Sequence, residues 1–243
     1  MRELDALREI IEDAERVVFF GGAGMSTESG IPDFRGTGGL YTQGGEDDIS
    51  PETIISGEYL MRYPDAFYGY YKRKMLYPDA RPNEGHYALA ELERRGKLSC
   101  VITQNIDGLH QAAGSRRVLE LHGSVNHNYC LHCGRTYPLS TILEAARAPY
   151  CPVCGGLIRP DVVLFGEGLN TELFTEAEEA IYEADVLIVG GTSLTVHPAC
   201  TLVDCFEGEH LVIINRTPTP YDALASHVLR TPLGETLASL CDL

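Results

Sequence analysis

The sequence lacks tryptophan altogether and is poor in positive charge. Its 243 residues include 19 Lys and Arg against 35 Asp and Glu, which gives a formal net charge of −16. So acidic a chain is a poor candidate for binding nucleic acid through a broad phosphate-contacting surface. It suits basic partners such as lysine-bearing protein segments, although an acidity that only aids solubility is the simpler explanation of the total.

Long apolar runs are also absent. No stretch approaches the roughly 18 residues that a membrane-spanning helix needs, so we expect no membrane partner. The opening residues, MRELDALREIIEDAER, are too charged for a secretory signal, and we expect a cytoplasmic protein. With 44% hydrophobic residues, the chain suits one large domain or two modest ones whose core needs no disulfide staples.

The apolar residues that are present alternate between strand-like and helix-like patterns. Short runs rich in Val and Ile, typical of buried parallel strands, lie at 16–20, 99–104, 185–191 and 210–215. Helical patterns lie at 2–15, 83–95, 171–184, 197–205 and 233–240. This alternation predicts an α/β fold with a doubly wound parallel sheet. Residues 36–81, with a helical patch near 58–76, and residues 123–159 break the alternation and predict a smaller second lobe.

The first predicted strand ends in the segment FFGGAGMSTESGIPDFRG, residues 19–36. Gly21, Gly22 and Gly24 permit a phosphate to approach the backbone of a turn that precedes a helix. The dinucleotide fingerprint G-x-G-x-x-G nevertheless fails, because Thr27 occupies its third glycine position. A structural turn therefore explains these glycines as well as a cofactor site does.

The end of this segment, GIPDFR, is unusual for a plain loop. It places a rigid proline, a carboxylate, an aromatic ring and a guanidinium in a row. Asp33 would anchor the loop, Phe34 would cover a flat ring, and Arg35 would meet a phosphate with two hydrogen bonds.

A second polar segment, TQNID, follows the strand predicted at 99–104. It therefore lies at the carboxyl edge of the sheet, where ligands of open α/β folds bind. Asp107 with neighbouring backbone groups matches the one acceptor and two donors of a carboxamide such as nicotinamide. The alternative is a polar turn that satisfies its own backbone, as Asn-x-Asp segments often do, and the residues alone favour it.

Four of the eight cysteines form two C-x-x-C pairs, Cys130/Cys133 and Cys151/Cys154, with 17 residues between the pairs. This spacing is typical of a zinc site. Four thiolates close a tetrahedron around Zn²⁺ and leave no open position, so we expect a structural site. A redox role lacks its thioredoxin-like context, and a site in which a nearby histidine replaces one cysteine remains an alternative.

The chain closely resembles the sirtuins, the NAD-dependent protein deacylases, in a series of ordered motifs. They are GAGMSTESGIPDFRG, TQNIDGLHQAAG, LELHGS, the two cysteine pairs, RPDVVLFGE, GTSLTVHPA and IIN. The resemblance implies a Rossmann-type NAD-binding domain formed by residues 1–35, 82–122 and 160–243. It further implies a cofactor loop and helical module at 36–81 and a zinc-binding module at 123–159. One departure is Gly21, where the family usually has threonine.

The resemblance also implies site residues by position. Contacts with NAD are implied for Gly22, Ala23, Gly24, Ser26, Thr27, Asp33, Phe34, Arg35, Gln104, Asn105, Ile106, Asp107, His122, Gly191, Thr192, Ser193, Asn215 and Leu233. Contacts with an acyl-lysine substrate are implied for Val163, Phe165, Gly166, Glu167 and Val196. Structural zinc is implied at Cys130, Cys133, Cys151 and Cys154. The alternatives are ordinary strand core for Val163 and Phe165 and a turn cap for Asn215.

The motif LELHGS places His122 at the family's general-base position, and Asn105 matches its water-orienting amide. A lone histidine after a strand is otherwise more often structural than catalytic. An imidazole with an ordinary pKa of about 6.5 accepts a proton at neutral pH. The implied reaction is attack of the acyl-lysine carbonyl oxygen on the nicotinamide-ribose C1′, followed by base-assisted attack of a ribose hydroxyl and then by water. Its products are nicotinamide, free lysine and O-acyl-ADP-ribose.

Two other functions stay open on the sequence. An NAD-dependent protein ADP-ribosyltransferase would share the cofactor site, and a non-catalytic NAD or acyl-lysine binding module would have no need of a base. Within the deacylases, enzymes that remove succinyl groups resemble one another in a Tyr-x-x-Arg pair. Here Tyr68 matches the tyrosine but Tyr71 occupies the arginine position, so we expect acetyl groups to be preferred.

Overall fold

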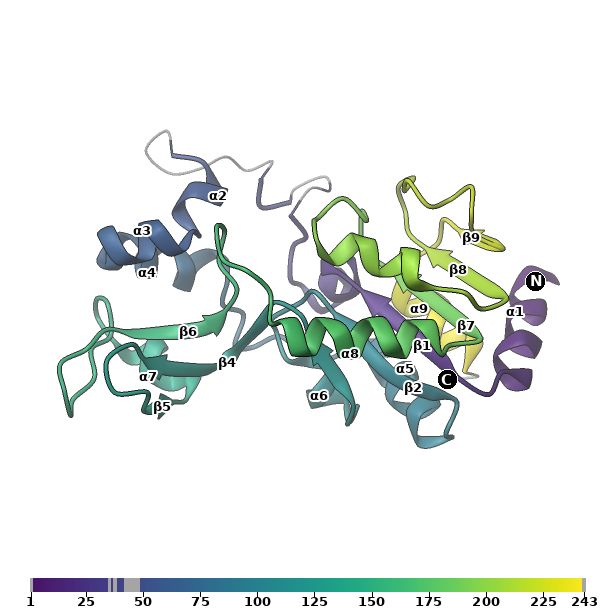
Figure 1. The fold of residues 1–243 in the computed structure, drawn as a ribbon, viewed down its shortest axis with the longest axis horizontal. Coiled ribbons are helices and arrows are strands. Elements are labelled where there is room, and N and C mark those ends of the chain that lie inside the picture. Colours follow the sequence, from purple (N-terminus) through teal and green to yellow (C-terminus); the bar gives the residue numbers. More distant parts are fainter. Residues whose placement is uncertain (1, 35, 37–38, 42–48, 242–243) are drawn as a thin grey trace.

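Six strands form one parallel sheet in the larger lobe of the computed structural model, which describes residues 2–34, 36, 39–41 and 49–241 (Figure 1). They are β1 (Val17–Gly21), β2 (Leu98–Thr103), β3 (Val118–Glu120), β7 (Val186–Gly190), β8 (His210–Ile214) and β9 (His227–Leu229). Their order in the sheet is β3-β2-β1-β7-β8-β9, with parallel pairing throughout. The chain order reverses between β1 and β7, so the sheet is doubly wound, as the alternation of elements predicts.

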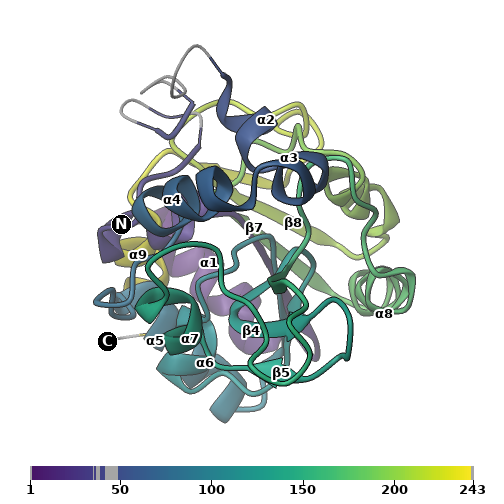
Figure 2. The same cartoon turned by 90° about the vertical axis from the view of Figure 1, so that its left-hand side faces the viewer.

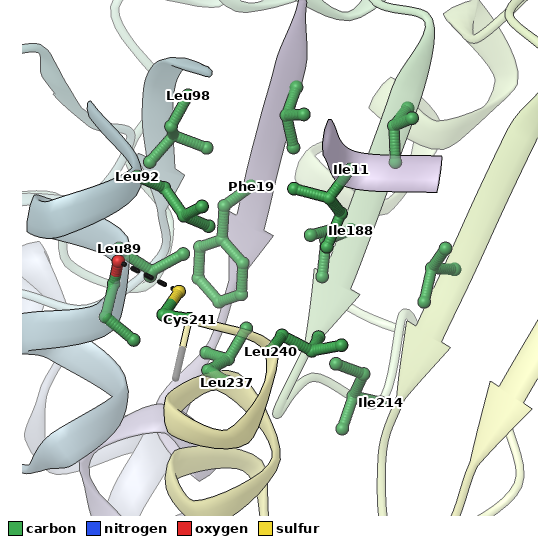
Figure 3. Packing of buried hydrophobic residues seen from close by; sticks show 14 of the residues in the cluster. Ile11, Phe19, Leu89, Leu92, Leu98, Ile188, Ile214, Leu237, Leu240 and Cys241 are labelled. Carbon is green, nitrogen blue, oxygen red and sulfur yellow. Dashed lines mark hydrogen bonds between the residues drawn. The ribbon is translucent and has the colours of Figure 1, made fainter. Parts of the chain in front are cut away.

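Helices cover both faces of this sheet. Because successive residues of a strand point to opposite sides, neighbouring side chains of β1 pack against different helices. Phe19 lies under α1 (Arg2–Asp13), α5 (Glu84–Arg94) and α9 (Leu233–Leu240), among side chains such as Leu89 and Leu237 (Figure 3). Phe20 belongs to the opposite cluster, under α8 (Thr171–Tyr182) and the 3₁₀ helix η2 (Ala199–Cys205). Every residue of β1 is therefore buried, which explains why its sequence is a continuous apolar run.

The smaller lobe combines a short antiparallel sheet with helices (Figures 1 and 2). The sheet has the order β5-β4-β6, formed by β4 (Gly123–Cys130), β5 (Thr136–Tyr137) and β6 (Ile158–Val162). The helices are α2 (Pro51–Ile54), α3 (Gly57–Arg62), α4 (Pro64–Lys74) and α7 (Leu139–Glu144). Tyr68 and Tyr71 of α4 pack with Ile158 of β6 in one apolar cluster, so the helical part and the cysteine-bearing part share a core.

Most predicted elements are present, and the differences have local causes. The helical patch at 58–76 is two helices, because Pro64 starts a new one. The segment at 197–205 is the 3₁₀ helix η2, and the turn after β1 leads into another, η1 (Ala23–Ser29). The apolar patterns do not predict β9 or α6 (Leu109–Ala113), which are too short to show a period.

The division of the chain into modules stays a prediction, and β6 runs across residue 160, one of the predicted boundaries. None of the helices in the described ranges combines the length and the apolar character that crossing a bilayer requires.

Candidate functional site

The segments that follow the carboxyl ends of the parallel strands meet at one edge of the sheet. The N–H of Gly22, after β1, donates to the carbonyl of Gly190 at the end of β7 (3.2 Å). The N–H of Gln104, after β2, donates to the carbonyl of Gly21 (3.0 Å). The first of these contacts lies where the strand order reverses, between β1 and β7, which is the position at which open α/β sheets bind ligands.

Glycines let two of these turns touch backbone to backbone. A Cβ atom on Gly24 would lie 2.6 Å from Cα of Gly191, and one on Gly22 would lie 2.8 Å from Cβ of Thr192. The N–H of Gly24 donates to the carbonyl of Gly191 (2.8 Å), whose φ of +62° is left-handed. The fold itself therefore requires these glycines, and their contact with a phosphate stays a prediction.

The departure at Gly21 has a steric reason. A Cβ on Gly21 would lie 2.5 Å from Cε1 of Phe19, and one on Gly190 would lie 2.9 Å from Cε2 of the same ring. Phe19 is fully buried, so its ring cannot swing out to make room. The phenylalanine thus fills the space that a threonine side chain at position 21 would occupy.

Asn105 and Asp107 meet at the hydroxyl group of Ser26. Ser26 Oγ donates to Oδ2 of Asp107 (2.6 Å) and accepts from Nδ2 of Asn105 (3.0 Å). Oδ1 of Asp107 accepts from the N–H of Leu109 (2.9 Å), which is the self-satisfying turn of the alternative interpretation. Burial raises the pKa of the Asp107 carboxyl, and the hydrogen bonds that it accepts from Ser26 and Leu109 oppose the rise. The result is an oriented, largely desolvated carboxyl group beside an amide, which suits recognition of a carboxamide.

His122 follows β3 and is oriented by the backbone. Its Nδ1 lies 2.9 Å from the carbonyl oxygen of Gln104. Because a carbonyl only accepts, Nδ1 carries the hydrogen and Nε2 carries the lone pair. Burial lowers the pKa of the imidazole, and the Gln104 carbonyl partly opposes this, so the ring is a neutral base at neutral pH. The side chain of Gln104 donates in turn to Oγ1 of Thr192 (3.2 Å), which ties the base to the turn after β7.

The loop with the sequence PDFRG has an internal anchor. Oδ1 of Asp33 accepts from the N–H of Gly36 (2.9 Å). The ring of Phe34 packs on that of Tyr41 with 5.4 Å between the centroids. Asp33 therefore fixes this loop, whereas Arg35 lies outside the described residues and its contact with a phosphate stays a prediction.

The four cysteines of the two C-x-x-C pairs converge in the smaller lobe. One sulfur atom from each lies within 4.8 Å of the others, with 3.4 Å between Cys130 and Cys154 and 3.7 Å between Cys133 and Cys151. A hydrogen bond from the hydroxyl of Tyr137 lowers the pKa of the Cys151 thiol, which favours the thiolate at this cysteine. Four soft sulfur donors at this separation fit a tetrahedral zinc ion with no open position.

The predicted substrate residues Val163, Phe165, Gly166 and Glu167 follow β6, and residues 164–167 form a turn. Phe165 pairs with Ser56 in an isolated parallel bridge, and its side chain is 43% exposed. Gly166 has a φ of +86°, which only glycine adopts readily. The N–H of Val163 donates to the carbonyl of His122 (2.9 Å), so this turn begins at the backbone of the predicted base.

A family model described as the Sir2 family matches residues 22–198. The chain belongs to the Sir2 family. This membership confirms the resemblance to the sirtuins that the ordered motifs carry.

Relatives and solved structures of the family cover almost the whole chain. A Cutibacterium acnes protein named NAD-dependent protein deacetylase is 53% identical over 236 residues, which are 97% of this chain and 96% of that protein. A Clostridium perfringens protein of the same name is 47% identical over 241 residues, 99% of each chain. A Sir2–p53 peptide–NAD+ complex matches with a TM-score of 0.87 and 36% identity, covering 98% of this chain and 97% of that one. These structures confirm the Rossmann-type fold class with its smaller lobe.

Three further residues with an implied NAD contact interact with other parts of the protein itself. Nδ2 of Asn215 donates to the carbonyl of Thr217 (2.9 Å), as a turn cap does. Oγ of Ser193 lies 2.8 Å from Oγ1 of Thr195, and Leu233 is buried in the core of the larger lobe. Their contacts with the nucleotide stay predictions, as do those of Ala23, Thr27 and Ile106. The contact of Val196 with the substrate also stays a prediction.

Two residues that shape the site escape sequence reasoning. Tyr137 lies 14 residues before Cys151, whose sulfur it contacts at 2.9 Å. Arg159 lies eight residues before Glu167 and binds its carboxylate with two hydrogen bonds. Only the presence of both charges within the motif RPDVVLFGE offers a signal for the second pair.

Proposed function

We propose that this chain is an NAD-dependent protein lysine deacetylase that releases nicotinamide, free lysine and O-acyl-ADP-ribose. The carrying observation is the His122 imidazole, fixed by the Gln104 carbonyl as a neutral base at the edge of the sheet where ligands bind. Family membership and relatives named NAD-dependent protein deacetylase support the same activity. Relatives of known structure include one described as Sir2 bound to acetylated peptide.

Each residue near the base has a distinct proposed role. NAD, when bound, supplies the leaving nicotinamide and the ribose that receives the acyl group. His122 takes a proton at Nε2 from a ribose hydroxyl, while the Gln104 carbonyl holds Nδ1–H and stabilises the resulting imidazolium. Asp107 accepts from the nicotinamide carboxamide, and Asn105 orients a water molecule. The hydrogen bonds of Ser26 to both residues support these roles, because they fix the two side chains before any ligand arrives.

The proposed substrates are acyl-lysine segments of proteins, with acetyl preferred over succinyl. Tyr68 and Tyr71 are each only 1% exposed, and the hydroxyl of Tyr68 donates to the carbonyl of Ile158 (2.5 Å). Position 71 thus offers an apolar ring in the core where a carboxylate-binding sirtuin would need a guanidinium. No nucleic-acid partner is proposed, since the net charge of −16 disfavours it.

The remaining parts of the proposal concern zinc, location and module boundaries. Cys130, Cys133, Cys151 and Cys154 would hold a structural zinc ion that joins the two ends of the cysteine-bearing segment. Cysteines that are not joined in disulfides persist in a reducing compartment, which supports a cytoplasmic location. The modules are those predicted above, a Rossmann-type domain with insertions at 36–81 and 123–159.

The test is an assay of acetyl-lysine and other acyl-lysine peptides with and without NAD, in which mass spectrometry identifies the products. Formation of bare lysine and O-acetyl-ADP-ribose supports the proposal. A heavier, ADP-ribosylated protein would show a transferase instead, and binding of NAD and peptide without turnover would show a binding module.

Two variants locate the activity. His122→Ala is expected to lose about a hundredfold or more of the turnover, because general-base catalysis is removed. His127→Ala is the matched control, since His127 is an exposed histidine on β4, five residues after His122, and is expected to keep full turnover. Substantial turnover by His122→Ala excludes this residue as the essential base.

A further inference from the structure

The turn that carries the predicted substrate residues is held by a charged pair that no step of the proposed reaction uses. Nη1 of Arg159 lies 2.6 Å from Oε1 of Glu167, and Nη2 lies 2.9 Å from Oε2. The two side chains are 13% and 29% exposed, so water screens the pair only partly. Parallel hydrogen bonds between guanidinium and carboxylate fix direction as well as distance.

The same guanidinium also holds the end of β6. Nη2 of Arg159 donates to the carbonyl of Val162 (2.9 Å), and Nε donates to the carbonyl of Pro160 (3.1 Å). Its carbon Cζ lies 5.9 Å from the centroid of the Tyr129 ring on the neighbouring strand β4. Arg159 is therefore fixed to the small sheet before it reaches the turn.

On the other side of the pair, Glu167 closes the turn on itself. Oε2 of Glu167 accepts from the N–H of Leu164 (2.9 Å), and the N–H of Glu167 donates to the carbonyl of Leu164 (3.0 Å). The carboxylate thus has its acceptor positions directed inward, toward Arg159 and the backbone. Each partner stabilises the charge of the other, so the pKa of Glu167 is lowered by Arg159 and the pKa of Arg159 is raised by Glu167.

The turn reaches both the helical module and the predicted base. The N–H of Phe165 donates to the carbonyl of Ile55, and its carbonyl accepts from the N–H of Gly57, both at 3.1 Å. A Cβ on Gly57 would lie 2.8 Å from Oε1 of Glu167, so the carboxylate touches this segment as well. At its start, the turn is bonded through Val163 to the carbonyl of His122 (2.9 Å).

We propose that Arg159 is a positioning residue for the acyl-lysine substrate, which acts through Glu167 and touches no reactant. By clamping residues 163–167 between the small sheet and residues 55–57, it holds the substrate-binding turn in the shape that receives the peptide. Glu167 is then an anchor of this turn and does not contact the peptide with its carboxylate. This inference rests on the proposed function and adds a specificity element to the same site.

The experiment compares steady-state kinetics of the full chain with an acetyl-lysine peptide and NAD. Arg159→Met keeps an unbranched apolar stem and removes the guanidinium group, and we expect it to raise KM for the peptide about tenfold. KM for NAD and kcat at saturating peptide should change by about twofold or less, since the base and the nucleotide-binding turns are untouched. Arg159→Lys should have a KM for the peptide between those of the wild type and Arg159→Met, because an ammonium group makes fewer of these hydrogen bonds.

Two further variants separate positioning from a general loss of stability. Glu167→Gln keeps the shape of the side chain and should also raise peptide KM, and it should add little in the Arg159→Met background because the pair acts as a unit. Arg117→Met is the matched control, since Arg117 forms an exposed pair with Glu176 (3.0 Å) on the larger lobe. Should Arg159→Met fail to fold, Glu167→Gln decides by the same readout.

The outcomes are distinguishable. A wild-type chain without NAD-dependent deacetylation contradicts the proposed function itself. An active wild type whose Arg159→Met and Glu167→Gln variants keep the peptide KM overturns the inference alone. The inference is also overturned if the variants raise KM for the peptide and KM for NAD to the same extent, lower kcat and lower the melting temperature. That pattern would mark a purely structural pair.

Discussion

Two buried histidines should make the folded state sensitive to mild acid. His86 on α5 and His110 on α6 are 0% and 1% exposed, with 4.7 Å between their ring centroids. Neither ring nitrogen of His110 has a hydrogen-bond partner among the described residues. Burial lowers the pKa of His86 to about 4 and that of His110 to about 3, where the charge of His86 contributes as well. Both rings are therefore neutral in the fold at neutral pH.

The sign of the effect follows from proton uptake. In the unfolded chain both imidazoles regain a pKa of about 6.5, so below that pH the unfolded state binds more protons than the folded state does. Stability is then complete above about pH 6.5 and falls as the pH drops toward the folded-state values. At about pH 5.5 each histidine costs about 1.4 kcal/mol, or about 3 kcal/mol for the pair, whatever the folded-state pKa provided that it lies well below 5.5.

The assay is urea unfolding of the wild type and of His110→Phe across this pH range. Phenylalanine keeps an aromatic ring in the site and cannot titrate, so the variant should lose about 1.4 kcal/mol less than the wild type at about pH 5.5. His122, whose pKa burial also lowers, and the zinc thiolates contribute equally to both proteins and cancel in the difference. His127→Phe, at an exposed position, should follow the wild type. Parallel curves for the wild type and His110→Phe would refute the reasoning.

Three other predictions follow from single contacts. Gly24→Ala puts a Cβ 2.6 Å from Cα of Gly191, so it should lower the free energy of unfolding by about 1–3 kcal/mol and weaken NAD binding. Urea unfolding and calorimetry measure the two effects, and unchanged values in both would contradict the geometry. Cys133→Ser should abolish stoichiometric zinc and lower the melting temperature, whereas Cys205→Ser, away from the cluster, should do neither. With Tyr71 buried in the core, an acetyl-lysine peptide should turn over faster than a succinyl-lysine peptide, and the reverse order would contradict the proposed acyl preference.

Continuous apolar runs make the central strands predictable from the sequence. All five residues of β1 and of β7 are buried, because helices cover both faces of the sheet, and no polar residue interrupts the run. The edge strands β3 and β9 have three residues each and are only partly buried, so they leave no comparable pattern. The sequence therefore predicts the centre of the sheet more clearly than its edges, and it misses β9.

The candidate site divides in the same way. His122 and the cysteine pairs are predictable, because a motif or a spacing marks them before any contact is known. The contacts themselves are long-range, since Ser26 and Asp107 are 81 residues apart and yet share a hydrogen bond of 2.6 Å. Ser26 meets Asp107 because β1 and β2 are neighbours in the sheet, and this neighbourhood of strands is set only when the sheet forms.

The glycine-rich turn shows why a motif can mark a binding edge without proving a ligand. The third glycine of the dinucleotide fingerprint permits a helix to pack closely on the strand. Here Thr27 takes that position, and its Oγ1 donates to the carbonyl of Gly24 (2.9 Å) inside the 3₁₀ helix η1. Gly24 and Gly191 are already required by their mutual contact, so the turn would need its glycines even without a nucleotide. What argues for catalysis is instead His122, because a neutral imidazole oriented by the Gln104 carbonyl has no structural task that a non-titrating side chain could not fill.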